Sequence, residues 1–367
     1  MNNNIINIEM KSEYIKLTTH IVPSNQKLKN AKIFNYGLAI LKTIHAFLVL
    51  AFHNFNYHST KNKIIIFITR NRRHHVPSFY IISFYFMALH LYSLNLKALI
   101  KRIVRLLIPY IGWPIIFYKL NRFINLKCNK NLPDSNEELK MQLLLGNRFI
   151  HPFWFQFDMI VITILLFIII FIFRKFSLFI FRILLILIYA IEYSGKDYTI
   201  YVQKYLKHDK YLLRFFLEST PYPITGFLLG FYKVLDIIQK QKIETLILSF
   251  LIYKIISDYN IFRKFKDSPY PGIHLNIQSI CLIFIFSLFP SHYITNKYIK
   301  IILNILTSYT AGIFYLHVPI RAYLRDYSYH FKKGTFIGII QEYLICYSIC
   351  FIGMNIFGDT PLKYMFS

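Results

Sequence analysis

The chain has 367 residues, 55% of them hydrophobic, and its 43 Lys and Arg against 17 Asp and Glu give a formal net charge of +26. The apolar share is above the roughly 45–50% that is usual for soluble domains. The apolar residues also come in long uncharged blocks, and eight or more such blocks exclude one soluble globular core. Basic residues lie mainly at block ends, as in Arg174 and Lys175. This placement favours contact with membrane lipid headgroups over binding of nucleic acid.

The chain begins with a polar, Asn- and Lys-rich tail over residues 1–33, without the pattern of a cleaved signal peptide. Apolar blocks long enough to cross a bilayer then follow one another. We therefore expect an all-α, polytopic transmembrane helical bundle of about ten spans over residues 34–357, and a C-terminal tail over 358–367. The expected spans are 34–54, 76–95, 103–120, 153–173, 177–194, 214–235, 243–259, 273–290, 298–319 and 336–357.

The sixth expected span contains two prolines and two glycines. Pro221 and Pro223 predict a bent helix, and Gly226 with Gly230 predicts close packing against neighbouring helices.

Ionisable residues inside spans are expensive and mark candidate functional sites. The first span holds Lys42 and His53, eleven residues apart. That spacing puts both on one helix face, roughly 16 Å apart along the axis. His53 has the right chemistry to take a proton from an attacking hydroxyl. The alternative is that Lys42 snorkels to the interface and His53 lies at the interface.

Arg102 and Arg105 lie one helical turn apart near the start of the third span. Two guanidinium forks at that spacing can bind phosphate, although an ordinary basic flank of a span is the alternative. The sequence has no GxSxG motif and no cysteine in a polar setting, so it offers no clear covalent nucleophile. If the chain transfers an acyl group, this favours direct attack by the acceptor over formation of an acyl-enzyme.

Further polar residues in or near spans are weaker candidates. Asp158, one turn after Trp154, is expected to pair with an intramembrane histidine or lysine, and His317 is a lone histidine near a span end. His74 and His75 are adjacent but have no third ligand nearby, and the four cysteines match no zinc pattern. No metal site is expected.

Six short motifs occur in order along the chain, and together they carry a family resemblance. They are Lys42 with His53; His75, Pro77 and Ser83 in HVPSFYIISFY; Arg102 and Arg105 before Pro109 and Tyr110; Trp154 with Phe155; Phe227 to Gly230; and Tyr315 with His317.

In these motifs the chain resembles the acyltransferase-3 family, the integral-membrane O-acetyltransferases of sugars and surface polysaccharides, including the fucose O-acetylase-like branch. The resemblance implies that His53 is the essential base and Lys42 its basic partner. It implies that Arg102 and Arg105 bind the phosphates of acetyl-CoA, the acyl donor, on the cytosolic face. It also implies a cytosolic N-terminus, a glycan or lipid-linked sugar as acceptor, and a multi-pass location in the plasma (inner) membrane if the source is bacterial.

Two positions depart from the family pattern, since Phe84 and Thr43 stand where glycine is usual. They leave open an inactive relative that acts as a scaffold for glycan enzymes. A polysaccharide flippase, polymerase or transporter is the other alternative, because such proteins also combine many spans with basic cavities.

Overall fold

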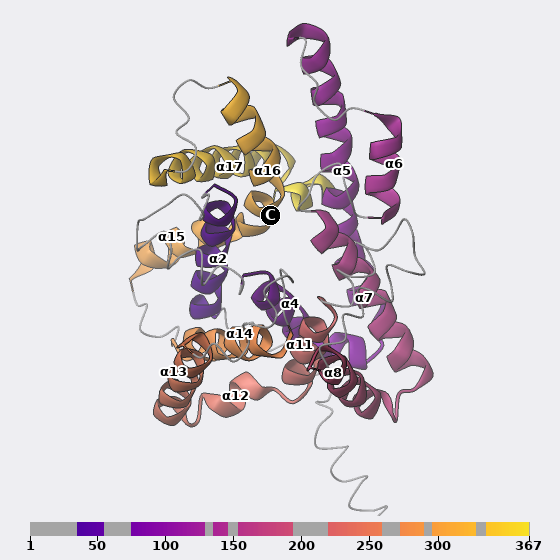
Figure 1. Cartoon of the computed structure of the whole chain (residues 1–367), viewed down its shortest axis with the longest axis vertical. Coiled ribbons are helices and arrows are strands. Elements are labelled where there is room, and N and C mark those ends of the chain that lie inside the picture. The colour runs from indigo at the N-terminus through magenta and orange to yellow at the C-terminus, as the bar shows by residue number, and fades with distance from the viewer. Residues whose placement is uncertain are drawn as a thin grey trace, which may run out of the picture. The chain divides into compact units, whose positions relative to one another are not determined.

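The computed structural model divides the chain into residues 1–35 and 36–367, and only the second unit and Asn35 are described below. The predicted polar tail over 1–33 lies outside the described residues. Every regular element in the described part is a helix (Figure 1), which agrees with the predicted all-helical class. The described ranges are 35–54, 75–128, 135–145, 153–193, 219–258, 272–289, 296–327 and 335–366.

The helices keep the order of the predicted spans, with shorter helices between them. They are α2 (Tyr36–Asn54), α4 (His75–Tyr92), α5 (Leu96–Cys128), α6 (Asn136–Leu145), α7 (Trp154–Ile172), α8 (Ser177–Tyr193), α11 (Pro221–Phe231), α12 (Val234–Ile238), α13 (Lys242–Asp258), α14 (Gly272–Ser287), α15 (Lys297–Ser308), α16 (Thr310–Tyr327), α17 (Phe336–Phe357) and the 3₁₀ helix η6 (Pro361–Met365).

Three of the described helices are long and apolar enough to cross a bilayer: Leu96–Asn125, Trp154–Ile172 and Phe336–Phe357. A fourth span results if the bent pair Lys297–Ser308 and Thr310–Leu324 counts as one. The figure of about ten spans stays a prediction. Shorter helices also expose apolar side chains, as α13 does at Ile247 and Phe250, which are 55% and 58% exposed. Such faces are suited to lipid rather than water.

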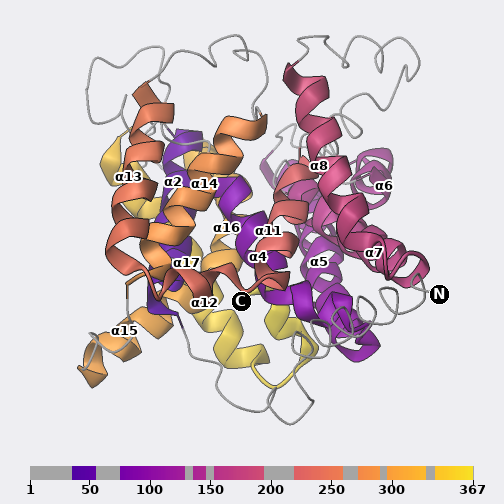
Figure 2. The same ribbon diagram turned by 90° about the horizontal axis from the view of Figure 1, so that it is seen from below.

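Helices α4 and α11 pack directly against each other, and both views show them side by side (Figures 1 and 2). Glycines make this approach possible. A Cβ atom on Gly226 would lie 2.4 Å from the carbonyl oxygen of Ile81, and one on Gly230 would lie 2.2 Å from that of Tyr85. The predicted close packing at these glycines is therefore present. The glycines that allow it lie on α11, whereas α4 has a phenylalanine at position 84, where the family usually has glycine.

The two prolines of the sixth expected span lie at the start of a helix. Pro221 is the first residue of α11 and Pro223 lies in its first turn, where a missing backbone N–H costs little. Residues 214–218 of the expected span lie outside the described residues, so the bend expected at the prolines stays a prediction. A break within the described residues comes at Lys233, whose φ of 51° is left-handed and separates α11 from α12.

The ninth expected span, 298–319, is broken in the structure. Helices α15 and α16 meet at Tyr309 with a bend of 48°. Hydroxyl groups surround the break: Ser308 donates to the carbonyl of Asn304 over 2.6 Å, and Thr310 donates to that of Thr307 over 3.2 Å. Side-chain hydroxyls that bond to nearby carbonyls compete with the helix ladder and bend it.

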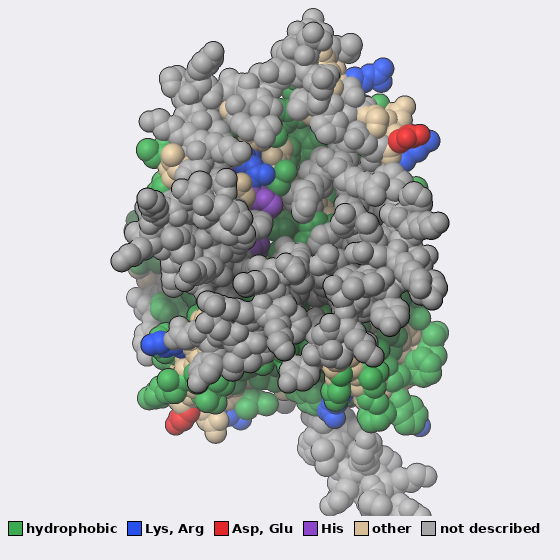
Figure 3. All heavy atoms as spheres, in the orientation of Figure 1, with side chains coloured by type: hydrophobic (Ala, Val, Ile, Leu, Met, Phe, Trp, Pro, Cys, Tyr) green, Lys and Arg blue, Asp and Glu red, His purple; other side chains and the backbone are tan. Residues whose placement is uncertain are grey.

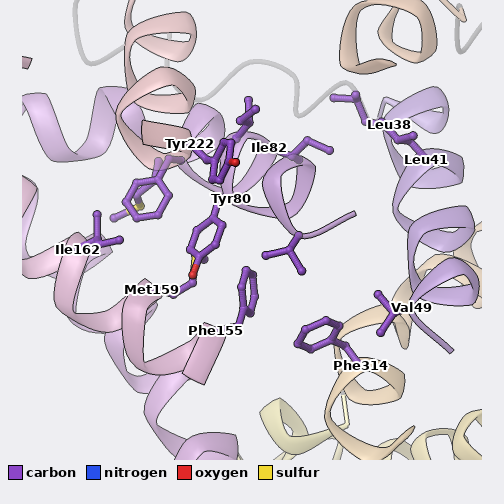
Figure 4. Packing of buried hydrophobic residues seen from close by; sticks show 14 of the residues in the cluster. Leu38, Leu41, Val49, Tyr80, Ile82, Phe155, Met159, Ile162, Tyr222 and Phe314 are labelled. Atoms are coloured by element: carbon purple, nitrogen blue, oxygen red, sulfur yellow. The ribbon is translucent and has the colours of Figure 1, made fainter. Parts of the chain in front are cut away.

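A cluster of aromatic side chains joins α4, α7 and α16. The ring of Phe155 lies 4.6 Å from that of Tyr80 and 5.2 Å from that of Phe314, and Tyr80 also stacks on Tyr222. Figure 4 shows Tyr80 and Phe155 converging at this point, with Phe314 on the adjoining side. Aromatic pairs at these distances add to the stability gained by burial. They fix the turn of α16 that carries His317.

Candidate functional site

Two histidines that are far apart in the sequence lie side by side in the structure. His53, in the last turn of α2, and His317, in α16, have ring centroids 5.0 Å apart with the planes tilted by 42°. We call His53 and His317 the histidine pair. The structure thus places the predicted base beside a residue that the sequence marked only as a supporting candidate.

The environment of His317 indicates which of its nitrogens accepts a proton. Its Nδ1 lies 2.6 Å from the carbonyl oxygen of Phe314. A carbonyl only accepts hydrogen bonds, so this geometry assigns the proton to Nδ1 and the lone pair to Nε2. Nε2 is buried and has no hydrogen-bond partner among the described residues. His75 and Arg321 are close electrostatic neighbours of the ring.

The surroundings of the histidine pair are basic. His75, predicted from the His-x-Pro motif, is the first residue of α4 and is buried. Figure 3 shows histidine side chains within a hollow of the face in view, with a Lys or Arg side chain above them. Among the described residues, no group of three histidine, cysteine or carboxylate side chains is placed to hold a metal ion.

Lys42 lies on α2, three turns before His53, and is partly buried. No carboxylate pairs with it in the described part of the chain. Its neighbour Thr43 donates to the carbonyl of Ala39 over 3.2 Å, within its own helix. The assignment of Lys42 as the basic partner of His53 stays a prediction.

Arg102 is held by groups from two other helices. Its Nε donates to the hydroxyl of Thr163 over 3.0 Å, and its Nη1 donates to the carbonyl of Ser83 over 3.4 Å. Its guanidinium carbon lies 4.5 Å from the ring centroid of Phe84, a cation–π contact. Nη2 has no partner among the described residues. The fork is therefore oriented while one donor group is left over.

Arg105 lies one turn further along α5 and is exposed. Its guanidinium carbon lies 5.2 Å from the ring centroid of Tyr364. We call Arg102 and Arg105 the arginine pair. In the ranges that the structure describes, no carboxylate pairs with either residue. Helix α5 begins at Leu96, before the expected span, so both arginines lie within continuous helix and share a face as predicted.

Phe84 of α4 departs from the family pattern. Glycine is usual at this position in the family, and the departure left open an inactive relative. The side chain lies fully buried under Arg102, while α11 approaches α4 at Ile81 and Tyr85. The larger residue therefore supports a predicted phosphate-binding group.

Among the described residues, Asp158 pairs with no histidine or lysine, so the expected pairing is not found there. Its carboxylate accepts a hydrogen bond from the hydroxyl of Tyr80 over 3.3 Å, and Ser219 is its other hydrogen-bond partner. The reason is that this face of α7 is turned toward α4 and the start of α11. Trp154, one turn earlier, is buried and meets the ring of Phe155 edge to face.

Two other candidate residues from the sequence, Ser83 and Tyr315, make different kinds of contact. Ser83 contributes through its backbone carbonyl, which binds Arg102. Tyr315 is buried and stacks on Phe153 with ring centroids 5.9 Å apart. It lies two residues before His317 in α16, so the two side chains leave the helix on different faces.

Gln156 is a residue that the sequence reasoning missed. It is fully buried; its Nε2 donates to the carbonyl of Leu106 over 3.4 Å, and its side chain neighbours that of Tyr315. Leu106 follows Arg105 directly, so Gln156 connects the arginine end of α5 to the histidine turn of α16. The signal was present as an amide between the aromatic residues of an otherwise apolar span.

A family profile that describes an acyltransferase domain, Acyl_transf_3, matches residues 35–358. This range holds every site residue named so far except Tyr364. The chain belongs to the acyltransferase-3 family. It is therefore an acyltransferase, and its apolar helices make it an integral membrane protein. Searches of the curated proteins and of the solved structures find no match.

Proposed function

We propose that this acyltransferase crosses the membrane about ten times and moves an acetyl group from acetyl-CoA to a hydroxyl of a sugar or of a surface or exported glycan. The observation that carries the proposal is the histidine pair, in which His53 lies 5.0 Å from a ring whose Nε2 is buried and unpartnered among the described residues. Proton transfer from a hydroxyl needs a positioned imidazole, and the histidine pair supplies one inside an otherwise apolar bundle.

In the proposed reaction the acceptor hydroxyl attacks the thioester carbonyl directly. The oxygen–carbon bond forms, the carbon–sulfur bond breaks, and His53 takes the hydroxyl proton. The departing CoA thiolate then receives that proton, so that the products are an O-acetyl ester and free CoA. His317 is the positioning residue beside His53, and the lone pair on its buried Nε2 receives no hydrogen bond from a donor among the described residues.

The arginine pair supports CoA as donor. Guanidinium groups match phosphate oxygens with parallel hydrogen bonds, and Arg102 keeps one buried N–H group for a ligand. A long pantetheine arm separates the thioester of CoA from its phosphates. Separate phosphate-binding and reacting regions are therefore expected, and Gln156 connects the helices that carry them.

The proposal is tested in cells that lack the protein and are complemented with the parent chain or with His53→Ala. We expect His53→Ala to insert normally but to reduce O-acetyl esters in surface carbohydrate by a factor of about 10²–10⁴, the usual contribution of a positioned base. Mass spectrometry of the released glycan measures the esters, and immunoblots of membranes measure the protein.

His90→Ala is the matched control, because His90 lies in the last turn of α4, away from the histidine pair. Acetylation by His53→Ala at the parent level would refute His53 as the base. Purified parent protein that binds no CoA would refute the donor and favour a transport role.

A further inference from the structure

The 3₁₀ helix η6 lies beyond the residues that the family profile matches, 35–358, and it packs against α5, where the yellow end of the chain meets that helix (Figure 1). Trp113 of α5 donates from Nε1 to the carbonyl of Met365 over 2.9 Å. Phe366 is buried, with its ring 5.5 Å from that of Trp113 and in contact with Gly353 of α17. These contacts fix the position of the preceding residues.

Two cations share the ring of Tyr364. The guanidinium carbon of Arg105 lies 5.2 Å from the ring centroid, and the Nζ of Lys363 lies 5.8 Å from it. Arg102 is one helical turn from Arg105. No carboxylate pairs with any of these three cations in the part of the chain that the structure describes. Like charges held together repel one another unless an anion lies among them.

We propose that Lys363 and Tyr364 complete a phosphate-binding site with the arginine pair. Tyr364 holds the guanidinium of Arg105 through its ring face, and Lys363 adds a third positive charge. The ligand is a phosphate ester. This inference rests on the proposed function for the identity of the ligand, since CoA carries a diphosphate and a 3′-phosphate, whereas an anionic lipid headgroup offers the same chemistry.

Three features favour the nucleotide over the lipid. Arg102 has a buried N–H group without a partner among the described residues. Its fork is oriented by Thr163 and Ser83, and Gln156 leads from this turn of α5 to Tyr315. A headgroup site at the lipid boundary needs none of this internal orientation. The site is therefore expected to bind the phosphates of a ligand that extends inward.

The test measures binding by the full-length purified protein in nanodiscs of neutral phosphatidylcholine. The probes are CoA and 3′-dephospho-CoA, and a second set of discs contains phosphatidylglycerol. The variants are Lys363→Gln, which removes only the charge, Tyr364→Leu, which removes the ring, and Tyr364→Phe, which keeps it. Lys254→Gln is the matched control, because Lys254 is an exposed lysine on α13, outside the helices α5 and α17 that pack against η6.

We expect Lys363→Gln and Tyr364→Leu each to weaken CoA binding about two- to fivefold, the usual range for partly exposed charge and cation–π contacts. Tyr364→Phe and Lys254→Gln should bind like the parent, and thermal melting should separate a folding defect from a binding defect. Parent-level CoA affinity in folded Lys363→Gln and Tyr364→Leu would overturn the inference and leave the proposed function standing.

The two ligand sources give different results. If the parent binds CoA and phosphatidylglycerol does not compete, the donor is the ligand. If the parent binds no CoA, but Lys363→Gln holds phosphatidylglycerol within the mixed discs more weakly than the parent does, the phosphate site stands with lipid as its ligand and the donor assignment fails. If the parent holds neither CoA nor phosphatidylglycerol, the phosphate site itself is refuted.

Discussion

The two ends of the candidate site are built in different ways. At the histidine end, His53 and His317 face each other across two helices, and a buried ring nitrogen is left unpartnered among the described residues. At the arginine end, Arg102 and Arg105 rest on the rings of Phe84 and Tyr364. Groups that must exchange protons need open lone pairs, whereas groups that must hold phosphate need fixed forks. Substitutions at the two ends should therefore change different kinetic constants.

After His53→Ala, the largest expected effect comes from substitution of His317. Asparagine at this position can keep the bond to the Phe314 carbonyl but has no group at the place of Nε2, whereas glutamine can reach that place but loses the bond. We expect His317→Asn to lower kcat by a factor of about 10²–10³, within the range for acid–base groups, with the KM for acetyl-CoA nearly unchanged. His317→Gln should keep more activity than His317→Asn. Steady-state kinetics at several pH values measures both.

A purely structural His317 would give the opposite order, because only His317→Asn preserves the bond to Phe314. A lower melting temperature in both variants, with equal activity per folded molecule, would also contradict a positioning role.

The second effect tests the arginine end. Arg102→Lys keeps the charge but cannot donate to Thr163, Ser83 and a ligand at the same time. Since hydrogen bonds to charged groups contribute about 1.5–3 kcal/mol, we expect the KM for acetyl-CoA to rise about tenfold or more, with kcat little changed. Arg182→Lys on α8 is the matched control, because Arg182 also lies over an aromatic ring, that of Tyr232. A fall in kcat with unchanged KM would contradict the division between the two ends.

The smallest effect concerns Phe84. Leucine keeps the apolar volume but removes the aromatic face under Arg102, and cation–π contacts contribute about 0.5–2 kcal/mol. We expect Phe84→Leu to raise the KM for acetyl-CoA about two- to tenfold and to leave protein folding intact. Enhanced donor binding by Phe84→Gly would show instead that the bulky residue obstructs the site, as an inactive relative would require.

Block length and charge placement were sufficient to predict an all-helical class. The described helices follow the expected spans in the same order along the chain. The spacing of Lys42 and His53, and that of Arg102 and Arg105, also follows from helix geometry alone. The break at Tyr309 was not predicted, because apolar composition continues across it and only the local hydroxyl bonds interrupt the ladder.

Partners across helices were the part that could not be predicted. Lipid and protein interior are equally apolar, so hydropathy does not tell which helix a given face meets. The contact of Asp158 with Tyr80 and Ser219 was therefore not predicted, and neither were those of Gln156 and Tyr364. His317 was recognised as a candidate, but its place beside His53 depends on how α2 and α16 pack.

The glycine contacts of α11 have a mechanical consequence. The backbone of α4 lies directly against Gly226 and Gly230 of α11. We therefore expect these two helices to move together as one rigid unit. Helix α16 has the opposite property, because it begins at a joint rich in hydroxyl groups. We therefore expect any displacement of α16 to occur about Tyr309 and to carry His317 with it.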